Sequence, residues 1–181
     1  VYGFQEWGPL LSTSTYKTQM LKDAKFSISE KCFYVDMELN TYAFINAKTI
    51  KYYPLDIYIY YIGRAGQSVS RQSYAKNYKN HEHVTLKLID EFYNNKKISK
   101  EKKKYIKNKI ILPLIKCQYM VVTEFLNNNV GFNSFDKKLK KYPELYKEMK
   151  GKKIFLHRLT KGHSIRILQI YESIMRRLRK N

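Results

Sequence analysis

The sequence predicts an α+β fold that is mostly helical, with a small α/β part followed by a helical region. Two β-rich runs on either side of Pro54, TIKYY and LDIYIYYIG, predict strands, and CFYV at residues 32–35 predicts another. From residue 71 onward, apolar residues recur every three or four positions, which predicts amphipathic helices. We therefore expect two parts, residues 1–70 and residues 71–181.

The first part combines short helices with these strands. Residues 17–24 and 36–47 have near-helical spacing, so a helix is expected over each range. After Pro54, isoleucine and tyrosine alternate so that both faces of the run carry large side chains, which is typical of a strand covered on each side. Gly63 and Gly66 predict a loop after that strand.

The second part is expected to contain helices alone. One apolar stripe over residues 74–92 predicts a single helix, and Ser99 is the predicted N-cap of the next. That next helix should run to about residue 127, with a kink or restart at Pro113. NNNVGFN at residues 127–133 predicts a turn, and shorter helices should follow near residues 134–150 and 162–180.

The charge of the chain is strongly positive, with 35 Lys and Arg against 15 Asp and Glu, a formal net of +20. Such a balance favours a nucleic acid, an anionic membrane surface or a phosphate-bearing substrate as partner, although AT-rich codon usage would produce the same bias. Residues 170–180 predict a basic amphipathic helix, which either packs on its own domain or lies on anionic lipid. The sequence contains no RNA-binding glycine-aromatic pattern, zinc spacing or helix-turn-helix pattern, so we expect no nucleic acid partner.

Cysteine and histidine usage does not indicate a metal centre. Cys32 and Cys117 each lie inside an apolar run and are expected to be buried thiols in a reducing compartment. His81 and His83 are two residues apart on a predicted helix, so their imidazoles point in different directions and cannot share one ion. No apolar run reaches the roughly 18 residues of a membrane span, and we expect a cytoplasmic protein, with peripheral attachment to the inner face of the membrane as an option.

Two carboxylates, Asp36 and Glu38, lie where the predicted strand CFYV gives way to a helix. Helix capping and the helix dipole are sufficient to explain acids at that point. The same placement also suits catalysis, because a strand end holds an ionised carboxylate at the rim of an α/β sheet. From the residues alone, both interpretations stay open.

The segments SEKCFYVDMEL and AKTIKYYPLDIYIYYIGRAGQSVS resemble the C-terminal part of family-2 glycosyltransferases, bacterial enzymes of the GT-A fold that build capsular and other surface polysaccharides. The upstream EWGPLLSTSTYKTQMLKDAKF is also similar to the family, so the resemblance covers about residues 6–94. It implies that Asp36 is the general base of an inverting sugar transfer. It further implies substrate contacts, which fall on Glu38, Trp7, Arg64, Gln67 and Ser68.

The resemblance also implies parts that this chain does not contain. The family binds its nucleotide-sugar donor and a divalent metal, Mg²⁺ or Mn²⁺, through an earlier half with a D-x-D motif, and no Asp-x-Asp occurs here. Since the chain also begins with Val1, we expect a C-terminal fragment that holds the acceptor side and is inactive alone. Its expected ligands are the donor and a saccharide or lipid-linked acceptor. The alternative is a basic non-enzymatic module that binds nucleic acid or an anionic membrane surface.

Overall fold

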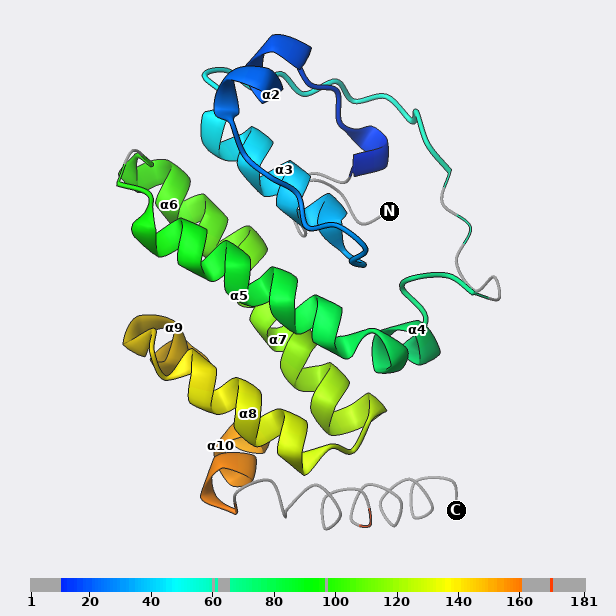
Figure 1. Ribbon diagram of the computed structural model, residues 1–181, viewed down its shortest axis with the longest axis vertical. Coiled ribbons are helices and arrows are strands. Elements are labelled where there is room, and N and C mark those ends of the chain that lie inside the picture. Colours follow the sequence, from blue (N-terminus) through cyan, green and yellow to red (C-terminus); the bar gives the residue numbers. More distant parts are fainter. Residues whose placement is uncertain (1–10, 60, 62–65, 97, 161–169, 171–181) are drawn as a thin grey trace. The chain divides into compact units, whose positions relative to one another are not determined.

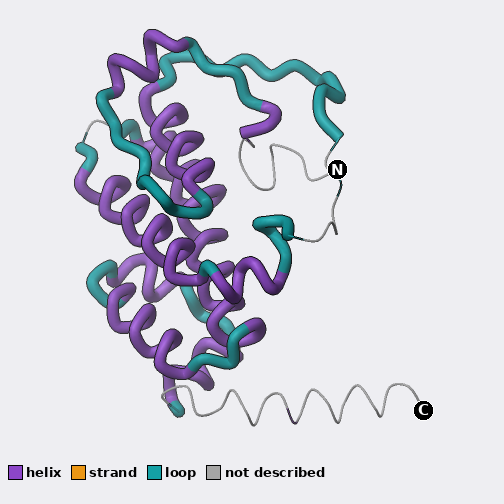
Figure 2. Tube along the Cα trace, turned by 45° about the vertical axis from the view of Figure 1, so that its right-hand side comes forward, coloured by secondary structure: helices purple, strands orange, loops and turns teal. Residues whose placement is uncertain are grey.

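The computed structural model describes residues 11–59, 61, 66–96, 98–160 and 170, and most of these residues lie in helices (Figure 1). This confirms the mostly helical prediction. The described ranges contain no β-strand, so the predicted small α/β part is not shown (Figure 2). By its contacts the chain divides into two units, Val1–Ile115 and Lys116–Asn181, whereas the sequence predicts a boundary after residue 70.

The helices of the first unit follow the predicted order closely. They are η1 (Leu11–Thr13), α2 (Thr18–Ala24), α3 (Val35–Asn46), α4 (Arg71–Lys76), α5 (Tyr78–Asn94), α6 (Lys100–Ile106) and η2 (Lys107–Ile111), with α7 (Leu112–Met120) crossing into the second unit. Helix α3 packs beside α5, and α5 contacts η2 (Figure 1). The unit is held by a core of aliphatic side chains, which includes Val84, Leu88, Ile89, Ile106 and Ile111.

The strand predicted at residues 32–35 is replaced by a turn that leads directly into α3. Tyr34 has φ 69°, a left-handed backbone, and α3 begins at Val35. The ring of Tyr34 stacks on Tyr74, with centroids 5.1 Å apart, and meets the edge of His81 at 5.2 Å. A run of only four apolar residues does not distinguish a strand from a packed turn, and here the contact with α4 and α5 decides the outcome.

The run predicted as a strand covered on both sides is extended, and no described strand lies beside it. Within residues 48–59 the large side chains lie open to solvent; Leu55 is 66% exposed, Ile57 63% and Ile59 78%. A strand needs a neighbour for its backbone hydrogen bonds. Since no strand lies beside this run in the described part of the chain, its alternating pattern has nothing to pair with there.

The single helix predicted from the stripe over residues 74–92 is divided at Asn77. Helix α4 ends at Lys76 and α5 begins at Tyr78, with Asn77 between them. The hydroxyl of Ser70 caps α4 by accepting the N–H of Ser73 at 3.1 Å. His81 is 2% exposed, which confirms its predicted place in the packed stripe.

From Lys100 the chain is continuously helical to Phe125, close to the predicted end at residue 127, so the helix does not restart at Pro113; a π-helical turn precedes the proline. Residues Lys107–Ile111 form a π-helical turn just before Pro113, in which the N–H of Leu112 bonds to the carbonyl of Lys107. Proline has no N–H and crowds the preceding turn, so the wider turn accommodates it without ending the helix.

The predicted N-cap at Ser99 is confirmed, since its hydroxyl accepts the N–H of Lys102 at 3.3 Å. Replacing Ser99 by alanine should lower the free energy of unfolding by about 1 kcal/mol, because one N–H of the first turn loses its partner. Urea unfolding of the variant measures this loss. Ser99→Asp keeps a capping oxygen and should retain most of the stability; an equal loss in both variants would contradict the role of the cap.

The second unit continues with η3 (Val121–Phe125), α8 (Asn129–Leu139), α9 (Pro143–Glu148) and α10 (Lys152–Leu159). The turn predicted over residues 127–133 is wrong beyond Asn128, because the side chain of Asn128 accepts the N–H of Gly131 at 2.9 Å and starts α8 there. The helix predicted over residues 134–150 is divided between α8 and α9. Helix α10 was not predicted, and the helix expected over residues 162–180 lies outside the described residues except for Ile170.

Candidate functional site

Asp36 lies in the first turn of α3, as the sequence predicts, but Tyr34 is the N-cap residue. The carboxylate is half-buried. Burial raises the pKa of Asp36 above its ordinary value, and the backbone N–H groups of Met37 and Asp36 offset part of that rise. A carboxylate with a raised pKa is a stronger base than a free aspartate, which suits proton abstraction.

Glu38, two residues further along α3, is fully buried and already bound. Its Oε1 accepts the hydroxyl of Ser29 at 2.7 Å, and its Oε2 accepts the backbone N–H of Ser29 at 2.9 Å. Lys87 of α5 donates to Oε2 at 2.7 Å. Burial alone would raise the pKa of Glu38, but the hydrogen bonds from Lys87 and Ser29 outweigh it and hold the pKa below its usual value. We call Ser29, Glu38 and Lys87 the Glu38 clamp.

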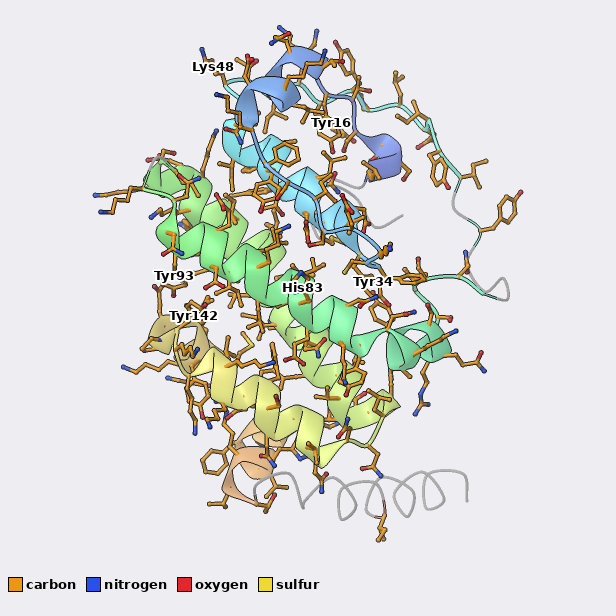
Figure 3. The ribbon with its side chains drawn as sticks, in the orientation of Figure 1. Tyr16, Tyr34, Lys48, His83, Tyr93 and Tyr142 are labelled. Carbon is orange, nitrogen blue, oxygen red and sulfur yellow. The ribbon has the colours of Figure 1, made fainter. Side chains whose placement is uncertain are left out.

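The clamp fastens the segment before α3 to α5. Lys87 also donates to the carbonyl of Ser27 at 2.9 Å and to the hydroxyl of Ser29 at 3.1 Å. His83, an exposed residue of α5, places its Nε2 3.2 Å from the same hydroxyl (Figure 3). One polar network therefore joins α3, α5 and the turn between α2 and α3.

The geometry of the clamp does not match that of an activated serine nucleophile. A hydroxyl carries one proton, and that of Ser29 goes to Glu38, so Lys87 and His83 face its oxygen as donors. Activation of a serine nucleophile needs a base strong enough to take the hydroxyl proton, and the acceptor here, Glu38, is a weak base because Lys87 and Ser29 hold its pKa below the usual value. The clamp therefore positions α3, and the carboxylate of Glu38 is occupied rather than offered to an acceptor hydroxyl.

The loop motif GQSVS is brought beside the start of α3. The hydroxyl of Tyr34 donates to the carbonyl of Ser68 at 3.2 Å, across 34 residues of sequence. Gln67 donates from its side chain to the carbonyl of Tyr61, and Gly66 has φ 79°, the left-handed region that glycine adopts readily. Of the other predicted substrate residues, Trp7 and Arg64 lie outside the described residues.

Sequence reasoning missed Ser29, Lys87 and His83. Ser29 opens the segment SEKCFYVDMEL but lies 9 residues before Glu38, and Lys87 lies 49 residues after Glu38. Lys87 is half-buried on the side of α5 that faces α3. This position is apparent only when the two helices are packed together, so the sequence alone does not indicate it.

A second polar cluster stabilises the second unit. Asp136 of α8 accepts Arg158 Nε at 2.8 Å and the hydroxyls of Tyr119 at 2.6 Å and Tyr146 at 3.2 Å. The guanidinium of Arg158 lies over the ring of Tyr146, 3.6 Å from its centroid, and donates to the carbonyl of Met149 at 3.1 Å. Because each side chain is already paired, we assign this cluster to stability.

Metal ligands do not gather in the described ranges: no group of three or more His, Cys, Asp or Glu side chains could hold an ion there. Cys32 and Cys117 are half-buried, and they form no disulfide. Within the same ranges, no helix has both the length and the apolar character needed to cross a bilayer.

Comparisons of the chain with protein-family models, with curated proteins and with solved structures find no match.

Proposed function

We propose that this chain is the acceptor-side, C-terminal part of an inverting glycosyltransferase of the GT-A type. The enzyme would transfer a sugar from a nucleotide-sugar donor to a growing surface or capsular polysaccharide. In this proposal Asp36 is the general base, and the donor and its divalent metal are bound by residues outside this chain.

The contact between Tyr34 and Ser68 carries the proposal. The two motifs of the family resemblance, FYVDMEL and GQSVS, are separate in sequence, and the hydrogen bond from the hydroxyl of Tyr34 to the carbonyl of Ser68 joins them. Asp36 follows Tyr34 by two residues and lies in the first turn of α3. A base and a loop that face one substrate must lie close together, so this contact supports a shared site.

The chemistry assigned to Asp36 is the removal of one proton. As the acceptor hydroxyl attacks the anomeric carbon, Asp36 takes its proton, and the bond from that carbon to the nucleotide diphosphate breaks. The diphosphate leaves as an anion, so no second carboxylic acid has to protonate it. Glu38 keeps α3 in place through its clamp, while Trp7, Arg64, Gln67 and Ser68 remain the proposed substrate contacts.

The test is Asp36→Asn in the longer protein that carries this chain behind its donor-binding half. Sugar transfer to the acceptor should fall by about 10²–10⁴-fold, because an amide cannot take the proton. Donor affinity should be unchanged. Transfer is measured with labelled nucleotide-sugars, and donor binding by calorimetry.

Asp90→Asn is the matched control, because Asp90 is an exposed acid of α5 that lies outside both motifs in the sequence. It should leave transfer at the original rate. Transfer that survives Asp36→Asn would exclude Asp36 as the base. A gene in which no donor-binding half precedes these residues would contradict the whole proposal.

A further inference from the structure

Lysine side chains gather on the second unit from the end of α8 to the start of α10. Residues 137–153 contain eight lysines against two glutamates, Glu144 and Glu148, and all eight lysines are exposed. They are Lys137, Lys138, Lys140, Lys141, Lys147, Lys150, Lys152 and Lys153. We call these eight residues the lysine surface. Its positive charge is far denser than charge balance or solubility requires.

Two large apolar side chains follow directly on α10 and are also exposed. Phe155 is 66% exposed and Leu159 70%. They are four residues apart on one helix, so they lie on the same side, and Lys152 lies three residues before Phe155 on that side too. The opposite side of α10 faces inward, since His157 is 3% exposed. On α10, an exposed phenylalanine and leucine therefore share a side of the helix with Lys152 of the lysine surface.

We propose that the lysine surface, together with Phe155 and Leu159, docks the protein on an anionic lipid bilayer. Lysines are attracted to acidic lipid headgroups, and phenylalanine and leucine gain by entering the boundary between headgroups and acyl chains. This combination of lysines beside exposed apolar residues on a helix is typical of proteins that lie on a membrane without crossing it. The proposal does not depend on Asp36, so it can fail or succeed separately from the proposed function.

Two features favour a bilayer over a nucleic acid as the partner. Residues 137–153 contain eight lysines and no arginine, whereas bidentate recognition of bases and phosphates favours arginine. Arg158 is the one arginine of α10, and it is held by Asp136 and Tyr119. Phosphate contacts alone would also give Phe155 and Leu159 nothing to bind.

The first experiment measures co-sedimentation of the full chain with phosphatidylglycerol-containing vesicles and with pure phosphatidylcholine vesicles. The chain should bind the anionic vesicles, and binding should weaken as salt rises. Replacing Lys137, Lys138, Lys140 and Lys141 together by glutamine should weaken binding at least about tenfold. The matched control replaces four exposed lysines of the first unit, Lys79, Lys96, Lys100 and Lys104, and changes the net charge equally. Equal loss in the two variants would overturn the proposal, because binding would then follow net charge and not this surface.

The second experiment tests the apolar part with Phe155→Ser and Leu159→Ser combined, which leaves the charge unchanged. Vesicle binding should fall about tenfold, while the thermal unfolding temperature stays within a few degrees, because exposed side chains contribute little to folding. A large fall in unfolding temperature with unchanged vesicle binding would overturn the proposal, since the two residues would then pack within the protein. Tight binding of a DNA duplex that this double variant leaves intact, without vesicle binding, would identify nucleic acid as the partner instead.

Discussion

Replacing Arg158 by methionine is expected to lower the free energy of unfolding of the second unit by about 3–5 kcal/mol. Asp136 would stay buried with its charge while losing the guanidinium 2.8 Å from its Oδ1. The hydroxyls of Tyr119 and Tyr146 would remain as its only described partners. Methionine keeps much of the packing volume, so the loss reports on the unpaired charge of Asp136 together with the lost contacts of the guanidinium to Tyr146 and Met149. Hydrogen exchange of amides in residues 116–160 measures the effect without assuming that both units unfold together.

The matched control is Lys153→Met on the same helix. Lys153 pairs with Glu124 at 3.3 Å, but both side chains are about half exposed, at 53% and 48%. Solvent screens such a pair, and its removal should cost no more than about 1 kcal/mol. If the two substitutions cost the same, burial would not be the reason for the importance of Arg158.

Replacing Glu38 by glutamine is expected to cost the first unit about 3 kcal/mol near neutral pH. Lys87 would lose its carboxylate, although its side chain is 26% exposed and water can solvate part of the charge. The pKa of Glu38 in the folded protein lies below its ordinary value of 4.5. A carboxylate of this kind adds stability above its unfolded pKa and loses that contribution as the pH falls through the folded pKa.

The wild-type protein should therefore lose stability as the pH falls from about 4.5 downward, and Glu38→Gln should remove this part of the loss. Asp36 acts with the opposite sign: burial raises its pKa, so its ionisation costs stability as the pH rises. The difference between wild type and Glu38→Gln in urea unfolding at several pH values isolates the clamp. Glu30→Gln changes an exposed glutamate of the same unit. This variant should lose the same stability as the wild type when the pH falls below about 4.5. If Glu38→Gln lost as much stability as the wild type below about pH 4.5, the assignment would be contradicted.

The helices could be predicted where local sequence determines them. Thr18–Ala24, Val35–Asn46 and the cap at Ser99 depend on apolar spacing and on one hydroxyl, and these signals act within a few residues. The outcome at Tyr34 could not be predicted the same way, because its left-handed backbone is stabilised by Tyr74 and His81, which are 40 or more residues away. The start of α8 was missed for a different reason: three asparagines predict a turn, yet the side chain of Asn128 caps a helix.

In the candidate site, too, features that depend on neighbouring residues could be predicted, and features that depend on distant residues could not. The motif around Asp36 correctly predicted an acid in the first turn of a helix, since that depends on neighbouring residues. The occupation of Glu38 by Ser29 and Lys87 depends on how α3 and α5 pack, which no pattern around residue 38 encodes. The sequence could therefore nominate two acids but could not tell that one is half-buried and the other is fully engaged.

The ion pair between Glu38 and Lys87 also affects how far the length of the chain between them can vary. It closes a loop of 49 residues, and the exposed run at residues 48–59 lies inside that loop. The entropy of closing a loop rises only with the logarithm of its length, so ten inserted residues would cost about 0.2 kcal/mol. Insertions and deletions in this run are therefore thermodynamically cheap, whereas the spacing from Ser29 to Glu38, which includes the first turn of α3, is fixed by direct contacts.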